Sequence, residues 1–107
     1  MTISFKSIAI WMPLFFLSAL SMWAQKDAKT TYLDKCSICH GQDGAGKTAK
    51  GKKVKAKDIR DTVGKISADE MIKIVENGKG TDMDAFGKEF SKDQIKALVD
   101  YYRSLAK

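Results

Sequence analysis

The sequence predicts an all-α fold with about three main helices, and three observations indicate it. Two segments begin with a serine that lies three residues before Glu or Gln, a pattern that caps the start of a helix, and apolar residues then follow at helical spacing. A third segment, which leads into the first cysteine, has apolar residues suited to one helical face. No stretch of useful length alternates apolar and polar residues as a half-buried strand does.

Residues 1–24 are typical of a secretory signal peptide. Lys6 is their only charge, an almost wholly apolar run follows it, and small residues lie near the end. Cleavage after Ser21 and cleavage after Ala24 both fit the preference for small residues. The alternative is an uncleaved membrane anchor, for which the apolar run is slightly short of the ~20 residues that a spanning helix needs. We expect export, with residues 25–107 as one domain in the periplasm or otherwise outside the cytoplasm of a bacterium.

The first expected helix spans residues 26–36. Ala28, Tyr32 and Leu33 have the spacing of one buried face. The domain of 83 residues is small, so we expect a disulfide, a metal or a large cofactor to stabilise it. A disulfide between Cys36 and the second cysteine, three positions on, would close a tiny loop and stabilise little. A metal or a cofactor is therefore the better expectation.

The pattern Cys36-Ser-Ile-Cys39-His40 carries the chemistry. Two thiols on one helical turn can each add to a vinyl group of the same haem, and the next residue can then bind iron through its imidazole. The pattern uses every cysteine and the only histidine of the chain. A thiol oxidoreductase of the thioredoxin type would need a βαβ context, and a structural zinc site would need a fourth good ligand. We favour one covalent haem c on Cys36 and Cys39, with iron bound by His40.

Residues 41–57 are rich in glycine and lysine and show little periodicity, so we expect a loop. Residues 41–48 also match G-x-x-x-x-G-K-[ST], the pattern of phosphate-binding loops. Such a loop needs a buried strand before it and a helix that opens at Lys47, and the sequence predicts neither. The domain is also too short for the parallel sheet that this loop serves. A nucleotide-binding function is therefore the less favoured interpretation.

Two capped helices follow. Residues 67–70 form one capping box, and Asn77-Gly78 ends the helix that it begins. A loop that contains Met83 leads to a second capping box at residues 91–94. The last helix has an apolar stripe made of Ile95, Leu98, Val99, Tyr102 and Leu105. We also expect an apolar surround for the haem, made of Ile59, Met71, Val75, Phe86, Ile95, Leu98 and Tyr101.

The sixth ligand of the iron has several candidates. No second histidine exists, so two imidazoles from this chain are excluded. Met71 lies on the apolar face of a capped helix, where methionine ordinarily fills the core. Met83 lies in a loop, which can bring its thioether to the face of the iron opposite His40. We favour Met83 over Met71, a lysine or an open site. A thioether ligand raises the reduction potential relative to a second imidazole.

The charge of the domain is positive. The whole chain carries +6 and Lys6 lies in the leader, so the rest carries +5. Six lysines fall between Lys47 and Lys57, either as a solvated loop or as a patch that steers encounter with an acidic redox partner. Nucleic acid is not an expected partner, because no aromatic residues interleave with these lysines and the chain is exported.

With these motifs the sequence resembles the class I cytochromes c, in particular the small mono-haem bacterial carriers, over about residues 28–105. The similar segments are the first helix with its haem motif, the glycine-rich turn, the methionine loop and the last helix. The family commonly has proline after the ligand methionine, where this chain has Asp84. It commonly has another proline where this chain has Lys57, whose backbone carbonyl would accept a hydrogen bond from the Nδ1 atom of His40.

The resemblance implies a cytochrome c fold around one haem, with Cys36 and Cys39 as attachment sites and His40 and Met83 as axial ligands. It implies outer-sphere electron transfer to or from respiratory partners, without catalysis. Contact with a membrane would come through a respiratory complex or an uncleaved anchor. Two other classes remain as alternatives: a high-spin haem enzyme or sensor with an open iron position, and a thiol oxidoreductase.

Overall fold

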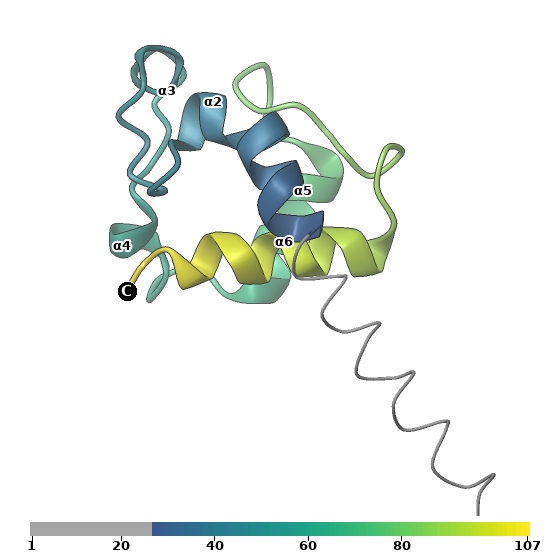
Figure 1. The fold of residues 1–107 in the computed structure, drawn as a ribbon. Helices are drawn as coiled ribbons and strands as arrows, with labels where there is room; N and C mark the ends of the chain where they lie inside the picture. Colours follow the sequence, from purple (N-terminus) through teal and green to yellow (C-terminus); the bar gives the residue numbers. More distant parts are fainter. Residues whose placement is uncertain (1–26) are drawn as a thin grey trace, which may run out of the picture.

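The computed structural model describes residues 27–107, and the leader with both candidate cleavage sites lies outside them. Residues 27–31 are helical and continue into a π-helical turn, η2, and a short helix, α2. Two short helices, α3 and α4, follow, and then the longer helices α5 and α6 (Figure 1). Their bounds are η2 Tyr32–Cys36, α2 Ser37–His40, α3 Ala49–Lys53, α4 Ile59–Thr62, α5 Ala68–Asn77 and α6 Lys92–Ser104.

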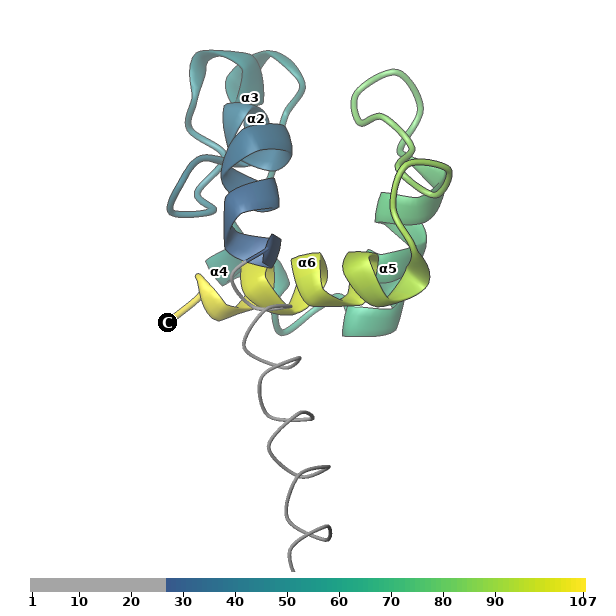
Figure 2. The same cartoon turned by 45° about the vertical axis from the view of Figure 1, so that its right-hand side comes forward.

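The predicted all-α fold is confirmed over the described residues, where β-pairing is limited to one isolated bridge between Lys79 and Met83. The three main helical segments are residues 27–40, α5 and α6. Figure 2 shows α2 and α3 on one side, the loop after α5 on the other, and α6 running across the base between them. Among residues 27–107, no helix has the length and apolar character to cross a bilayer.

The first helix is confirmed, but it extends beyond the predicted end at Cys36 and its buried face is narrower than expected. Ala28 and Tyr32 are buried, whereas Leu33 is 38% exposed. The amide of Ser37 donates to the carbonyl of Tyr32, five residues back, which is the bond of a π turn. Such a turn holds an extra residue, so it rotates the side chains around it away from the spacing of a regular α-helix.

Both capped helices begin where the sequence predicts. The hydroxyl of Ser67 accepts from the amide of Glu70 at 3.1 Å and begins α5. Ser91 and Gln94 form a complete capping box at the start of α6, with reciprocal bonds of 3.2 and 2.8 Å. Gly78, with φ of 75°, ends α5 in a conformation that favours glycine.

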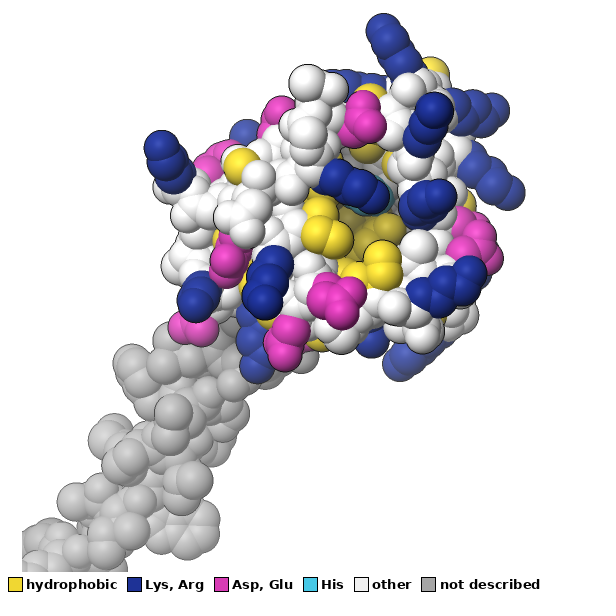
Figure 3. All heavy atoms as spheres, turned by 180° about the vertical axis from the view of Figure 1, so that it is seen from behind, with side chains coloured by type: hydrophobic (Ala, Val, Ile, Leu, Met, Phe, Trp, Pro, Cys, Tyr) yellow, Lys and Arg dark blue, Asp and Glu magenta, His cyan; other side chains and the backbone are white. Residues whose placement is uncertain are grey.

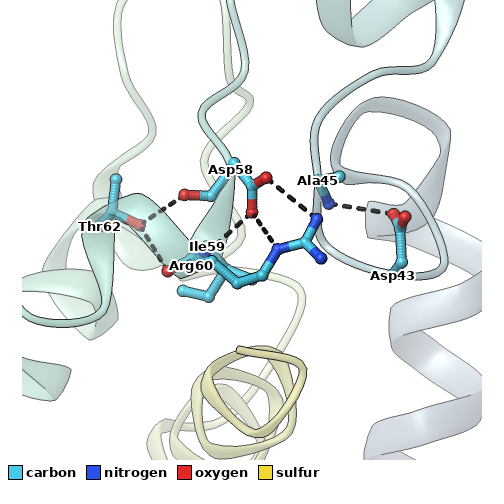
Figure 4. A network of polar contacts seen from close by, with 6 residues as sticks. All are labelled: Asp43, Ala45, Asp58, Ile59, Arg60 and Thr62. Carbon is cyan, nitrogen blue, oxygen red and sulfur yellow. Dashed lines mark hydrogen bonds and ion pairs between the residues drawn. The ribbon is translucent and has the colours of Figure 1, made fainter. Parts of the chain in front are cut away.

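The segment after His40 is more ordered than the predicted loop. It contains α3, which Thr48 caps, and it leads into α4, which Asp58 caps. The carboxylate of Asp58 accepts from the backbone and the guanidinium of Arg60, and these bonds hold the pKa of Asp58 below its usual range (Figure 4). Both short helices therefore begin at a side-chain cap. The spacing of apolar residues does not predict such helices.

The core lies between α4, α5 and α6. Four buried side chains form its centre: Ile59, Met71, Ile95 and Val99. Of the apolar surround that the sequence predicts, Ile59, Met71, Ile95 and Leu98 are buried, and Val75, Phe86 and Tyr101 are half-buried. Arg103 on α6 donates to the carbonyl of Ile66 at 2.9 Å and so joins α6 to the segment before α5.

Candidate functional site

The two cysteines lie three positions apart on one helical stretch. Cys36 is the last residue of η2, and Cys39 lies within α2, one residue before His40. Both thiols are free and partly buried. Burial, with a smaller effect of Cys39, raises the pKa of the Cys36 thiol to about 11. A redox-active thiol ordinarily has a lowered pKa, so Cys36 gives no support to disulfide exchange.

The backbone around His40 is fixed on both sides. The amide of Gly41 donates to the carbonyl of Ser37, and the amide of Gly46 donates to the carbonyl of His40, both at 2.8 Å. The hydroxyl of the buried Tyr32 donates to the carbonyl of Gly41 at 2.7 Å. Gly41 itself has φ of 82°, so the chain can turn sharply directly after the histidine. The α-carbon of His40 is therefore held firmly at the end of α2.

A second contact joins this turn to the lysine-rich segment. The hydroxyl of Thr48 donates to the carbonyl of Ile38 at 2.6 Å and accepts from the amide of Gly51 at 2.9 Å. Gly51 is buried, and a methyl group added to it would overlap the carbonyl oxygens of Cys39 and Gly46. The helix α3 is thus packed directly against the backbone of the cysteine–histidine motif.

The side chain of His40 is half-buried, and this burial lowers the pKa of the imidazole. The neutral ring, which has a free lone pair for a metal, is therefore the favoured form. Its Nδ1 atom has no hydrogen-bond partner among residues 27–107. The predicted bond to the carbonyl of Lys57 is consequently not formed. The backbone of Ala56 and Lys57 instead packs against Gly46, where an added methyl group would lie 2.7 Å from the carbonyl oxygen of Ala56.

An aromatic group supports the ring of His40. The ring of Tyr102 on α6 meets it edge to face, with centroids 4.9 Å apart and an angle of 61°. Tyr102 in turn stacks on Tyr32 at 5.9 Å, and Tyr32 contacts Tyr101 at 5.2 Å. The spacing of apolar residues predicts Tyr102 on the apolar stripe of the last helix, but it does not predict the contact with His40.

The two methionines of the described residues lie in different environments. Met71 is buried in the core, and its sulfur accepts a contact from the guanidinium of Arg103 at 3.7 Å. Met83 is half-buried in the loop between α5 and α6, where its backbone pairs with Lys79 at 2.9 and 3.2 Å. Figure 2 shows this loop on the opposite side of the molecule from α2. Met83 thus lies outside the buried core cluster.

One face of the molecule is hollowed, and apolar side chains form the floor of the hollow with Lys and Arg side chains around much of its rim (Figure 3). Within residues 27–107, no three His, Cys, Asp or Glu side chains gather to hold a metal ion. A zinc site therefore has no support. The donor set does fit a haem, which needs only the two thiols at its edge and one imidazole on its iron. The half-buried ring of His40, whose Nδ1 atom has no hydrogen-bond partner among the described residues, is consistent with that role.

The glycine-rich turn does not have the form of a phosphate-binding loop. Its amides are already used, because Ala45 donates to the carboxylate of Asp43 at 3.0 Å and Gly46 donates to His40 (Figure 4). The helix after it begins at Ala49 and not at Lys47, and the residues described before it are helical. The match to the phosphate-binding pattern is therefore accidental.

An all-helical fold of three main helices with this motif defines a small mono-haem c-type cytochrome. Residues 24–101 match the sequence model of the family described as "Cytochrome C oxidase, cbb3-type, subunit III", and the chain belongs to this family. A cytochrome c domain implies a covalently bound haem c. The predicted fold and the resemblance to class I cytochromes c are thus confirmed.

Known proteins that are similar to this chain include an oxidase subunit and a c-type cytochrome. The cbb3-type cytochrome c oxidase subunit FixP of Azorhizobium caulinodans is 30% identical over 84 residues, which are 77% of this chain and 27% of that protein. The chain thus spans about a quarter of the length of this relative. The solved structure of the KustC0563 c-type cytochrome has a TM-score of 0.70 at 28% identity. That likeness covers 75% of this chain and 98% of the other.

Proposed function

We propose that this protein is an exported electron carrier that transfers single electrons to or from respiratory partner proteins. Cys36 and Cys39 would hold one haem c through thioether bonds, and His40 and Met83 would bind its iron. The observation that carries the proposal is the placement of both thiols and the half-buried imidazole of His40 on one short helical stretch, with the Nδ1 atom of His40 lacking a hydrogen-bond partner among the described residues. The bound haem supplies a metal that gains and loses one electron without binding a substrate.

The residues of the chain would set how easily that electron moves. Apolar side chains on the floor of the hollow keep water away, so little solvent has to reorganise when the charge changes (Figure 3). The thioether of Met83 is a weaker donor than an imidazole and would raise the reduction potential. With both axial positions filled by the chain, no position would remain for a substrate, in contrast to a haem enzyme or a sensor.

The covalent bond to haem is tested with the full chain expressed in a host that matures c-type cytochromes. We expect the exported protein, after cleavage of its leader, to carry haem that survives denaturation, as seen by haem staining and mass spectrometry. Replacing both Cys36 and Cys39 by alanine should abolish covalent haem, because the two thiols that form the thioether bonds are removed. A wild-type protein from this host with free thiols and no iron would contradict the proposal and would favour a thiol oxidoreductase.

The partner is proposed from the distribution of charge. Residues 44–57 contain six lysines and no acidic residue, and all six lysines are exposed. In the part of the chain that the structure describes, none of them forms an ion pair, since the ion pairs are Lys35–Glu89 and Arg60–Asp58. These lysines lie on α3 and on the residues on either side of it, and α3 packs against the backbone of the cysteine–histidine motif. We propose that their positive charge attracts an acidic surface on a respiratory partner.

We expect the double variant Lys50→Gln and Lys53→Gln to be oxidised more slowly by a purified cbb3-type oxidase at low salt. The difference from wild type should shrink as ionic strength rises, because salt screens the attraction between exposed charges. The matched control removes the same charge from exposed lysines elsewhere, with Lys65→Gln and Lys96→Gln. Equal slowing by the two double variants would show that net charge, and not this patch, guides the encounter.

A further inference from the structure

We propose that Tyr102 is a positioning residue for His40, and that its aromatic ring sets the orientation of the imidazole plane. The inference rests on the proposed function, in which His40 binds the haem iron. It concerns the rotation of a ligand that the helix α2 already holds in place. Tyr102 would act through His40 and would not itself touch the reacting metal.

The contact between the two rings has the geometry of a favourable aromatic pair. Their centroids are 4.9 Å apart and their planes are inclined by 61°, so an edge of one ring meets a face of the other. Tyr102 is itself fixed, because it is half-buried and stacks on Tyr32, which is only 1% exposed. The imidazole therefore rests against a ring that cannot easily move away.

No hydrogen bond competes with this contact. A histidine that binds a metal ordinarily donates its other ring N–H to a carbonyl or a carboxylate, which fixes the plane of the ring. The Nδ1 atom of His40 is buried and has no such partner within residues 27–107. The bonds of Gly41 and Gly46 hold only the backbone of this residue. Rotation of the imidazole about its side-chain bonds is thus limited by packing, and Tyr102 supplies the aromatic part of that packing.

The ring of Tyr102, and not its hydroxyl, is the functional group in this proposal. Burial raises the pKa of that hydroxyl to about 12, so the side chain stays neutral at any ordinary pH. Phenylalanine keeps the ring and should therefore keep the orientation of His40. Leucine and methionine fill space without an aromatic edge and should release it.

The test compares oxidised, haem-loaded variants by electron paramagnetic resonance and by the hyperfine-shifted haem methyl signals in proton NMR. Both measurements report the plane of an axial imidazole. We expect Tyr102→Leu and Tyr102→Met to shift the g values and to redistribute the methyl signals, and Tyr102→Phe to match wild type. Tyr102→Met has an unbranched, flexible side chain that adapts to an irregular gap, so it gives a result even if Tyr102→Leu does not fold.

Phe90→Leu is the matched control, because Phe90 is a half-buried aromatic residue packed against the same core as Tyr102, with no ring contact to His40 among the described residues. It should leave the spectra unchanged. The inference is overturned if the Tyr102 variants match wild type, or if Phe90→Leu shifts the spectra equally. Failure of the proposed function would be seen separately, as a wild-type protein without the signals of a histidine-bound haem.

Discussion

Replacing Met83 by alanine is expected to convert the haem of this protein from a low-spin to a high-spin state. The change removes the thioether that we propose as the sixth ligand and leaves a methyl group that cannot reach the iron. The reduction potential should fall, because the stabilisation of reduced iron by the soft sulfur is lost. External ligands such as cyanide should then bind without delay. Absorption spectra in both oxidation states and a potentiometric titration measure the two effects.

Met71→Leu is the matched control for this experiment. Met71 lies in the core with its sulfur against Arg103, and leucine has nearly the same volume. We expect a loss of stability below about 1.5 kcal/mol and an unchanged low-spin spectrum. A Met83→Ala protein that keeps the low-spin spectrum of wild type would rule out Met83 as the ligand. A wild-type protein that is already high-spin would favour the alternative of a haem enzyme or sensor.

Local signals in the sequence predicted the main helices well. Ser67 and Ser91 begin α5 and α6 because the serine hydroxyl accepts a hydrogen bond from the amide three residues on. Such a cap depends only on four consecutive residues. Gly78 ends α5 for an equally local reason, since its positive φ favours glycine. Cys36, Cys39 and His40, which we propose as the haem site, are predicted from their spacing alone. Each of these features is encoded within one turn of the chain.

Features that depend on distant contacts could not be predicted in the same way. The helix α3 has no amphipathic pattern, and it is held by Thr48 bonding to the carbonyl of Ile38, ten residues away. Leu33 is exposed because a π turn changes the direction of side chains, and no short motif marks that turn. The predicted hydrogen bond between the Nδ1 atom of His40 and the carbonyl of Lys57 is not formed. The position of that carbonyl depends on how the backbone of Lys57 packs against Gly46, which the sequence does not predict.

Replacing Gly51 by alanine should be the most damaging small change in the lysine-rich segment. The added methyl group would overlap the carbonyl oxygen of Cys39 and would lie 2.6 Å from that of Gly46. Both obstacles are backbone atoms that cannot swing aside, so α3 must move away from the haem motif. We expect a loss on the order of 3 kcal/mol in the free energy of unfolding, measured by denaturant titration of the haem-loaded protein.

Gly64→Ala is the control with the same chemical change. Gly64 has an ordinary φ, and no heavy atom lies within 4 Å of an added methyl group. Alanine there should change stability by less than about 1 kcal/mol and should raise it, because the unfolded chain loses freedom. Equal effects of the two variants would mean that α3 is only loosely attached. A large effect confined to Gly51 would mean that the lysines proposed to meet the partner are carried on a rigid support joined directly to Cys39.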